Sequence, residues 1–465
     1  MPPIRADVAY NTLAGISFSL FKEYKEYHKK QKHNREYGTR MAECGLRNVW
    51  RRYGGWGGHM GATAWRYHAD AHSAFRNPHS SHPCAPKTAG LKTPGFIQEF
   101  MKIGLVRRGF SRAGGAESYL KRLGRGLVDA GHQLTLFSTE EWPRAEWPYG
   151  TLIRLKESAP LPFSQAVQAA RNSVEILYSL ERIESCDCYR AGDGVHRVWL
   201  EKRKTFEPGW KKSLRFSNGK HNQILELEQK LLGQQGTRRV ITNSKLIKNE
   251  IVAEFGYPEG QISVIYNGIA DVHFKKKPGS RWDLRFDAGL SDFDIGILFA
   301  GSGWERKGLR FAIEAIRSLK DRRIKLLVAG EGKKPAFTLP NTRFLGPVED
   351  MHSLYVAADL FVLPTVYDPF SNACLEALSA GVPVITTSSN GFSEIIQSGV
   401  HGEVLDRPDD VPALAYAINH WCALGQKDDV RAGCVARAQE YTVARNVTET
   451  MKVLEQIHSD KKSNR

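Results

Sequence analysis

The sequence predicts an α/β protein with two doubly wound domains, and three observations lead to this fold class. From Met101 onward, short apolar segments typical of buried strands alternate with amphipathic helices. A glycine-rich turn follows the first strand of each half, at 114–115 and at 301–303. The whole pattern occurs twice, which predicts two similar parallel-sheet domains that face a central cleft.

Composition excludes several classes of protein. The chain has 465 residues, of which 41% are hydrophobic, so it can bury cores and is not disordered throughout. No apolar run approaches the ~18 residues that a membrane-spanning helix needs, and no charged segment followed by an apolar one begins the chain. Seven cysteines, an odd number, do not form a disulfide framework. We therefore expect a protein of a reducing compartment.

The net charge of +16 is concentrated at the N-terminus. Residues 1–100 carry 15 Lys and Arg against 7 Asp and Glu, and they hold 7 of the 15 histidines without any strand–turn–helix pattern. We expect residues 1–100 to be a poorly ordered or spurious basic extension, with a functional basic arm as the alternative. A protein that begins at Met101 should then keep full activity and stability. An excess of Lys and Arg over Asp and Glu also favours an anionic partner, such as nucleic acid, acidic lipid or a phosphorylated substrate.

The first domain is predicted over residues 101–275. MKIGLV at 101–106 is a strand pattern, and the segment 116–130 places its apolar residues at steps of three and four, as an amphipathic helix does. Gly131 follows as a C-cap, and HQLTLFS at 132–138 is the next strand. Strand, loop, helix and strand in this order are typical of a parallel sheet.

The second domain is predicted over residues 276–445, with a C-terminal helix and tail at 446–465. The join lies near 271–282, where Lys, Pro and Gly cluster. Its strands are predicted at DIGILFA, IKLLVAG, NTRFLG, DLFVLPT, VPVITT and GEVL, and its helices at LRFAIEAIRSL, MHSLYVAA and ACLEALSAG.

Two loops at the carboxyl ends of strands are candidate anion sites, because ligands of open α/β sheets bind there. Gly114 and Gly115 begin a helix whose free N–H groups suit a negative group, although many such turns are only tight turns. In the second half, Arg306 and Lys307 stand on a glycine-rich loop and would suit a diphosphate. Solvated surface charges are the alternative there.

Asp368 and Glu376 form the most specific pattern, with one carboxylate before a helix and one inside it. Pro369 keeps Asp368 extended, and Ser371 and Asn372 are suited to cap the helix. Glu376 lies in the otherwise apolar segment LEAL, where an acid is costly to bury unless it binds hydroxyl groups, as those of a sugar or ribose. A plain exposed helix residue is the alternative.

These segments together resemble the retaining, nucleotide-sugar-dependent glycosyltransferases of the GT-B class, family 4, which have two Rossmann-like domains. The resemblance runs from Met101 to about Gln456 and is carried by the paired acids, E-x7-E in the family and Asp368…Glu376 here. Further matching segments are GGAE, ITNSKLIKNEI, VIYNGI, RKG, FLG and EALSAGVPVITT. CDCYRAGDGVHR at 186–197 resembles the subgroup that adds glucose to the inner-core heptose of lipopolysaccharide.

The resemblance implies roles for individual residues. Lys307 matches the lysine that binds the donor diphosphate, while the family's arginine is replaced by Ser302, so Arg306 is expected to supply that contact. Glu376 matches the acid that holds the ribose, and Asp368 matches the acid at the transferred sugar, with a shorter side chain. The resemblance implies a donor site formed by these residues and by Gly114, Gly115, Phe344, Leu345, Gly346, Phe370, Ser371 and Asn372, and an acceptor site at Asp193 and His196.

The implied chemistry uses a nucleotide sugar, UDP-glucose, as co-substrate, with no other cofactor and no metal. Lys307, Arg306 and helix N-termini would stabilise the departing diphosphate. Asp193 would orient the acceptor, with a turn residue as the alternative interpretation. Cys186 and Cys188 have the spacing of a metal pair, but incidental thiols are the preferred interpretation.

The implied partners are a lipid-linked saccharide acceptor and an anionic membrane surface, without nucleic acid. Residues 197–221 combine cations with Trp and Phe, as segments at a bilayer interface do, with a solvated basic loop as the alternative. The expected location is cytoplasmic, peripheral on the inner face of the inner membrane.

Other functions remain open from the sequence. The same scaffold could transfer another sugar, use another acceptor or epimerise a nucleotide sugar. The chain could also be a non-catalytic basic protein that binds membranes or nucleic acid. Release of UDP with and without a lipid acceptor would separate the enzymatic alternatives.

Overall fold

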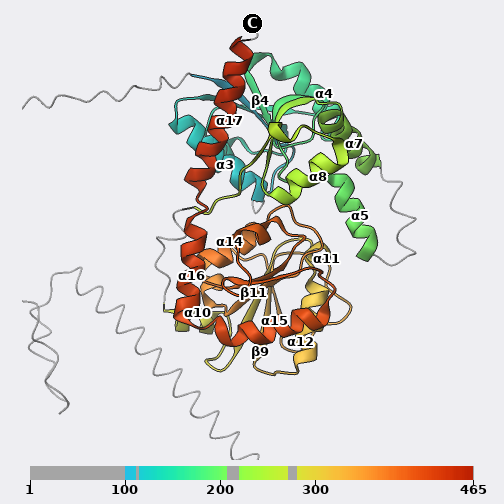
Figure 1. Cartoon of the computed structure of the whole chain (residues 1–465). Helices are drawn as coiled ribbons and strands as arrows, with labels where there is room; N and C mark the ends of the chain where they lie inside the picture. The colour runs from blue at the N-terminus through green and yellow to red at the C-terminus, as the bar shows by residue number, and fades with distance from the viewer. Residues whose placement is uncertain (1–99, 112–114, 207–218, 271–279, 464–465) are drawn as a thin grey trace, which may run out of the picture. The chain divides into compact units, whose positions relative to one another are not determined.

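The computed structural model describes residues 100–111, 115–206, 219–270 and 280–463 (Figure 1). Apart from Phe100, the predicted extension at 1–100 lies outside the described residues, as do Gly114 and the predicted domain boundary at 275 and 276.

The first domain contains a parallel sheet of seven strands in the order β3-β2-β1-β4-β5-β6-β7. The strands are β1 (Lys102–Val106), β2 (Gln133–Thr139), β3 (Thr151–Leu155), β4 (Ile176–Ser179), β5 (Cys186–Arg190), β6 (Thr237–Thr242) and β7 (Ile262–Val264). The described helices are α3 (Gly115–Asp129), α4 (Pro160–Ala170), α5 (His196–Phe206), α7 (Gly219–Glu228) and α8 (Lys245–Phe255). The predicted strand–helix–strand unit at 101–138 is confirmed.

The second domain contains a parallel sheet of six strands in the order β10-β9-β8-β11-β12-β13. The strands are β8 (Ile295–Ala300), β9 (Ile324–Ala329), β10 (Thr342–Gly346), β11 (Leu360–Leu363), β12 (Val384–Thr387) and β13 (Gly402–Leu405). The described helices are α10 (Arg281–Asp287), α11 (Trp304–Lys307), α12 (Leu309–Leu319), α13 (Met351–Ala357), α14 (Asn372–Ser379), α15 (Val411–Leu424) and α16 (Asp428–Gln439).

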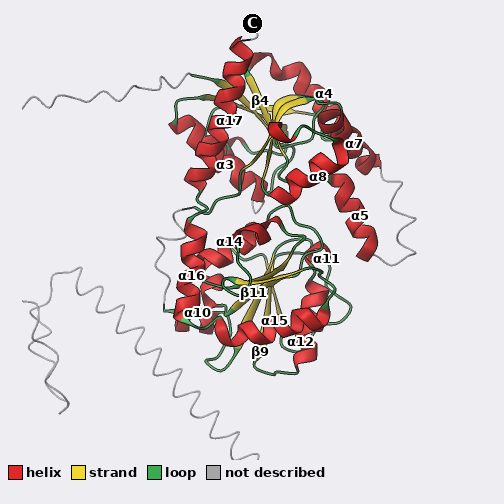
Figure 2. Cartoon of the chain, in the orientation of Figure 1, coloured by secondary structure: helices red, strands yellow, loops and turns green. Residues whose placement is uncertain are grey.

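Helices cover both faces of each sheet (Figure 2). In the first domain, Leu120, Leu123 and Leu127 of α3 pack on one face of the sheet, in a core separate from the one that contains Phe163 and Val167 of α4. The central strands β8 and β11 of the second sheet are continuous buried apolar runs, as expected of a parallel sheet covered on both sides.

The last helix, α17 (Val443–Ser463), leaves the second domain and packs beside α3 of the first (Figure 1). Its buried Leu454 and Ile457 belong to the core of the first domain. Lys461 Nζ donates a hydrogen bond to Oδ1 of Asp187, in β5, at 2.9 Å. The helix begins three residues before the predicted boundary at 446.

Each sheet has one position where the strand order reverses. These switch points lie between β1 and β4 and between β8 and β11. Ligands of doubly wound sheets bind outside the carboxyl ends of the strands at such points. The loops after β1, β8 and β11 contain the segments in which the sequence predicts a ligand.

No helix among the described residues is both long and apolar enough to cross a membrane.

Candidate active site

One cavity joins the loops at both switch points. Its volume is about 1010 Å³, and residues of both sheet domains line it. Of the predicted site residues in the described chain, those that line it are Gly115, Asp193, Arg306, Lys307, Asp368, Phe370, Ser371, Asn372 and Glu376. The structure therefore brings together residues that are more than 250 positions apart in the sequence.

Lys307 and Asp368 form a buried ion pair in the wall of this cavity. The Lys307 ammonium donates to Asp368 Oδ2, and both residues are less than 10% exposed. Arg306 lies on the outer side of the pair, with Nη1 4.0 Å from Asp368 Oδ1 and 2.9 Å from the Tyr367 carbonyl oxygen, to which it donates. An ammonium has three donors, so Lys307 can bind a phosphate oxygen without leaving Asp368.

The two cations keep Asp368 ionised. Burial alone would raise the pKa of this carboxyl, but the charges of Lys307 and Arg306 outweigh burial and hold the pKa below its usual range. The ion pair therefore persists at neutral pH.

Glycines fix the backbone on both sides of Arg306 and Lys307. Helix α11 lies between Gly303 and Gly308, both of which adopt left-handed φ angles, +74° and +80°. At Gly308 a Cβ atom would lie 1.9 Å from the Pro364 carbonyl oxygen, so only glycine fits there. The close approach of this turn to the end of β11 brings Lys307 to Asp368.

Glu376 extends from α14 into the opposite part of the cavity. Tyr355 Oη donates to Glu376 Oε2 at 3.0 Å, and Arg122 of α3 acts on Glu376 electrostatically. Burial raises the pKa of Glu376, although the Tyr355 bond and the Arg122 charge act in the other direction. A partly desolvated carboxylate with one donor keeps acceptor capacity for further hydroxyl groups.

The N-terminus of α14 differs in one respect from the sequence prediction. Ser371 is the N-cap residue, but its side chain makes no capping bond, and its amide donates to Asn390 Oδ1 at 3.2 Å. The Ser371 amide is therefore engaged within the protein. Apart from an interaction with the Cys374 thiol, the buried Ser371 Oγ has no hydrogen-bond partner among the described residues, although its residue lines the cavity. The hydroxyl, rather than the amide, is the group that remains for a ligand.

Asp193 and His196 lie in different surroundings. The side chain of Asp193 is 58% exposed at the cavity, with Oδ2 3.8 Å from Nη1 of Arg107. His196 is not among the residues that line the cavity; its Nε2 lies 3.0 Å from His221 Nδ1. Burial and the charge of Arg182 lower the pKa of His196 to about 4, which makes it a weak base.

The predicted donor-site residues Phe344, Leu345 and Gly346 lie beside the cavity rather than on it. Phe344 packs against Trp304, with ring centroids 5.3 Å apart, and the Gly346 carbonyl accepts from the Gly330 amide at 2.8 Å. The residues of this loop that line the cavity are Pro347 and Val348. The residues of this loop that line the cavity thus directly follow the three predicted ones.

Several cavity residues were not singled out in the sequence, although Arg190 lies within CDCYRAGDGVHR. Arg107, Tyr119, Arg122 and Arg190 come from the first domain, and Tyr355 comes from α13.

Tyr367 connects the two domains directly beside Asp368. Its Oη donates to Glu250 Oε2 at 2.7 Å and accepts from the Val195 amide at 2.8 Å. The position before Asp368 in the acidic motif is the one signal in the sequence that could have indicated this residue.

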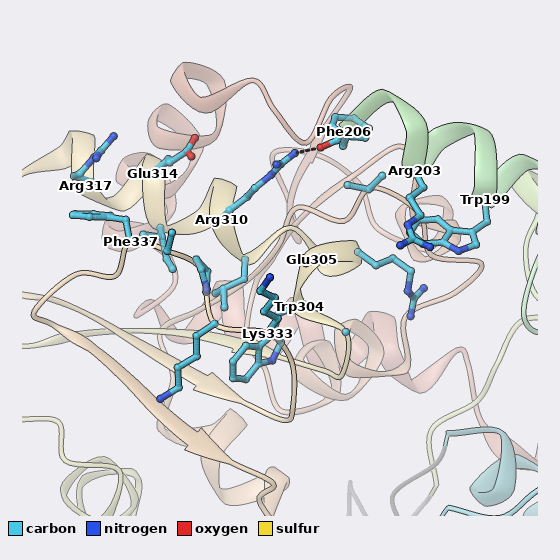
Figure 3. A pocket seen from close by; sticks show the side chains of 18 residues that line it. Trp199, Arg203, Phe206, Trp304, Glu305, Arg310, Glu314, Arg317, Lys333 and Phe337 are labelled. Atoms are coloured by element: carbon cyan, nitrogen blue, oxygen red, sulfur yellow. Dashed lines mark hydrogen bonds between the residues drawn. The ribbon is translucent and has the colours of Figure 1, made fainter. Parts of the chain in front are cut away.

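Figure 3 shows a second cavity, of about 770 Å³. Arg306 lines both this cavity and the first. Trp199, Arg203 and Phe206 reach it from α5, and Arg310 donates to the Phe206 carbonyl oxygen at 3.2 Å. Trp304 and Phe337 add apolar surface, while Arg317, Lys333 and Lys334 add positive charge. This cavity combines aromatic surface with an excess of cations.

The five cysteines of the described chain are free and buried, and burial raises the pKa of the Cys186 thiol to about 12. Among the described residues, no group of three or more His, Cys, Asp or Glu is arranged to hold a metal ion.

Comparison with known proteins agrees with this geometry. Residues 294–423, which include Lys307, Asp368 and Glu376, match the model of a family described as glycosyl transferases group 1. This match covers the second sheet and the helices α11 to α14.

Two curated relatives are glycosyltransferase-like proteins of microbes. An uncharacterized glycosyltransferase of Methanocaldococcus jannaschii is 33% identical over 195 residues, which are 39% of this chain and half of that protein. A probable transglycosylase of Burkholderia thailandensis is 28% identical over 382 residues, which are 78% of this chain and 99% of that protein. The chain thus spans half of one relative and nearly the whole of the other.

Solved structures share the fold at low identity. The crystal structure of WaaG, a glycosyltransferase involved in lipopolysaccharide biosynthesis, superposes with a TM-score of 0.59 at 19% identity, covering 75% of this chain and 95% of that one. HepE of Anabaena in complex with UDP-glucose superposes with a TM-score of 0.60 at 18% identity, covering 77% and 100%. The predicted GT-B fold of two Rossmann-like domains is confirmed.

Proposed function

We propose that this chain is a retaining glycosyltransferase of GT-B family 4 that transfers a hexose, glucose from UDP-glucose, to a lipopolysaccharide core acceptor. The observation that carries the proposal is the cavity at both switch points, where a buried Lys307–Asp368 pair and Glu376 meet within the segment that matches the group 1 glycosyltransferase model. HepE, which shares the fold, was solved with UDP-glucose, and WaaG acts in lipopolysaccharide biosynthesis.

Each residue of the site would have a separate role in such a transfer. Glu376 would accept hydrogen bonds from the ribose hydroxyls, and Lys307 and Arg306 would contact the diphosphate. The bond between the anomeric carbon and the diphosphate oxygen breaks as the acceptor oxygen bonds to the same face of that carbon. The acceptor proton passes to the departing phosphate. The cations stabilise the charge that develops on the leaving group, which is the largest electrostatic demand of the step.

Two cations in the site can supply the charge that a divalent metal supplies elsewhere, so we propose that transfer is independent of metal. Activity that persists in excess EDTA is the expected result. Loss of activity in EDTA, restored by a divalent ion, would contradict it.

The proposal is tested by donor binding and by product analysis. Thermal-shift measurements with UDP-, ADP- and GDP-glucose should show stabilisation by one nucleotide class, because a ligand that binds only the folded state raises its stability. UDP release should require a lipid-linked saccharide, and NMR of the product should show the anomeric configuration of the donor. UDP release that is independent of any acceptor would contradict the proposed transfer to a lipid-linked saccharide. A product with inverted anomeric configuration would contradict the retaining mechanism.

We further propose that the enzyme acts as a peripheral protein on the cytoplasmic face of the inner membrane, through residues 197–221. In the described part, 197–206, Arg203 and Phe206 lie beside the aromatic and cationic cavity of Figure 3. Lys202 differs, because its ammonium lies 3.6 Å from Glu250 and 5.1 Å from the Tyr367 ring centroid. Lys202 is therefore turned towards the protein and is not expected to contact lipid.

Membrane contact is tested with vesicles. Binding to vesicles with anionic lipid, weakened by salt, is expected because each cation near such a surface contributes about 1 kcal/mol. Replacing Arg203, Lys204, Lys211 and Lys212 by Gln should abolish it and leave nucleotide binding intact. The control replaces an equal number of exposed cations elsewhere: Lys320, Arg322, Lys427 and Lys452. If both variants lose vesicle binding equally, the binding depends on net charge and not on residues 197–221.

A further inference from the structure

Arg190 is a buried guanidinium without a carboxylate. It ends β5, is 3% exposed and lines the cavity. Its guanidinium carbon lies 3.9 Å from the centroid of the Tyr119 ring, and Nη2 donates to Asn267 Oδ1. Among the described residues, Nη1 has no hydrogen-bond partner and no acid lies within ion-pair distance of Arg190.

Arg122 of α3 is half-buried near Arg190 and also makes no ion pair within 4 Å among the described residues. It lines the same cavity, and its buried Nε has no partner within the described chain. Burial lowers the pKa of Arg122; the charge of Glu376 opposes this effect, and the charge of Arg190 adds to it. Two guanidinium groups close enough to repel each other thus face one cavity.

Three other arginines that are buried or largely buried are ion-paired. Arg285 Nη1 lies 2.8 Å from Asp359, Arg182 Nε lies 2.9 Å from Glu228, and Arg107 contacts Glu117 and Glu181. A buried unpaired charge costs several kcal/mol, so natural proteins rarely keep one without a use. The unpaired guanidiniums of Arg122 and Arg190 coincide with the cavity, which indicates an anionic ligand.

The surroundings of Arg190 favour a phosphate group in particular. Asn267 connects Arg190 to the start of α14. It accepts from Arg190, and its Nδ2 donates to Asn372 Oδ1 at 2.7 Å. A Cβ atom on Gly115, the first residue of α3, would lie 3.1 Å from the Asn372 side chain. The N-termini of α3 and α14 therefore approach each other beside Arg190. Free N–H groups and fork-shaped guanidinium donors are the groups that bind phosphate oxygens.

We propose that Arg190 and Arg122 form a phosphate-binding site on the first domain, which acts together with Lys307 of the second. Such a site would compensate for the serine at position 302, where the resembled family carries an arginine. The phosphate belongs either to the donor diphosphate or to a phosphorylated acceptor. This choice of ligand rests on the proposed function, whereas the existence of the site does not.

Calorimetric titration with inorganic pyrophosphate tests the site without any assumption about base or sugar. The wild type should bind pyrophosphate, and Arg190→Gln and Arg122→Gln should each weaken binding about 10- to 100-fold, as expected for a lost charged hydrogen-bond partner. The control is Arg125→Gln, on the same helix as Arg122, with its side chain 77% exposed and paired with Asp129 on the surface. It should leave the affinity unchanged.

Thermal denaturation distinguishes binding from a structural role. Removing an unpaired buried charge should leave the Tm of Arg190→Gln equal to that of the wild type or raise it. A marked fall in Tm would show that Arg190 stabilises the fold and would overturn the proposal. Equal affinity of Arg190→Gln and wild type for pyrophosphate, or no binding by the wild type, would overturn it as well.

Titration of pyrophosphate into UDP-saturated protein identifies the source of the phosphate. If UDP blocks pyrophosphate, the donor diphosphate occupies the site. If pyrophosphate still binds, and Arg190→Gln removes that binding, the site serves a phosphorylated acceptor. The protein could also bind pyrophosphate through Arg190 but bind no nucleotide sugar. This result would support the phosphate site and contradict the proposed function.

Discussion

The two acids of the site, Asp368 and Glu376, have pKa values that are shifted in opposite directions. Asp368 has two cations close by and a lowered pKa, whereas Glu376 has the neutral donor Tyr355, the weaker influence of the Arg122 charge and a raised pKa. The two acids of one motif therefore respond differently to pH: Glu376 takes up a proton at a higher pH than Asp368 does. A carboxylate that is kept ionised at a cost to stability is typical of a binding site.

The first prediction concerns the variant Glu376→Gln. Because the folded-state pKa of Glu376 lies above its unfolded value, the ionised group costs stability at neutral pH, and this cost disappears as pH falls through the raised pKa. We expect Glu376→Gln to keep or raise Tm at pH 7, with the difference from wild type vanishing at acidic pH. Donor affinity should fall roughly 10- to 100-fold. Thermal scans over pH and calorimetry measure both, and unchanged donor affinity would refute the ribose contact.

The second prediction concerns the Lys307–Asp368 pair. Lys307→Met leaves the Asp368 carboxylate buried without its main partner, which should cost about 3–5 kcal/mol. Adding Asp368→Asn should restore much of that stability, because a neutral pair replaces an unpaired charge. Turnover should stay low in both variants, because the leaving-group cation is missing. Full activity in the stable double variant would show that the diphosphate is held elsewhere.

The sequence predicted the loops of the site better than the contacts within them. Asp368, Glu376 and Lys307 stand in motifs at strand ends, and a parallel sheet brings strand ends to one edge. The engagement of the Ser371 amide by Asn390 and the contact of His196 with His221 depend on side chains from other elements, which spacing does not reveal. Arg190 lies in the segment CDCYRAGDGVHR but was not singled out, because its position in the sequence does not reveal that its guanidinium lacks an ion-pair partner.

At the scale of elements, the short helix α11 depends on two glycines with different constraints. Gly308 has no room for a Cβ atom, whereas at Gly303 nothing lies within 4 Å of one. Both have positive φ angles, so both substitutions carry backbone strain, but only Gly308 adds a collision with the end of β11.

The third prediction compares Gly308→Ala with Gly303→Ala. The strain of an alanine at positive φ is about 1–2 kcal/mol, and Gly303→Ala should lose only this amount. Gly308→Ala must also displace Pro364 or α11, and we expect a larger loss of stability and a loss of activity through movement of Lys307. Chemical denaturation and a transfer assay measure both effects. Similar losses in the two variants would show that the Pro364 contact is unimportant.

At the scale of the whole molecule, the boundaries of the fold do not follow the order of the sequence. The alternation of strands and helices predicted both sheets, because period and length are local properties. The docking of α17 on the first domain was not predicted, because an amphipathic helix does not reveal which domain provides its apolar surface. The same helix could have covered the second sheet.

The fourth prediction tests this docking with Leu454→Ala. Leu454 is fully buried against the first domain, so the truncation should cost about 2–5 kcal/mol. Hydrogen exchange should accelerate in β1, β2 and α3 and change little in β8 to β13. The neighbouring exposed position provides the control, Gln456→Ala, which should be neutral. Equal acceleration in both sheets would mean that the domains unfold as one unit.

The route of α17 also has a consequence for biosynthesis. A ribosome releases the strands of the first domain before any part of the second, at roughly 5–20 residues per second. The apolar face of α3 that Leu454 and Ile457 cover nevertheless stays open until the last residues emerge. The domain that is made first is thus the one completed last. A nascent chain would expose that surface throughout the synthesis of the second domain, which makes it a natural place for a chaperone to bind.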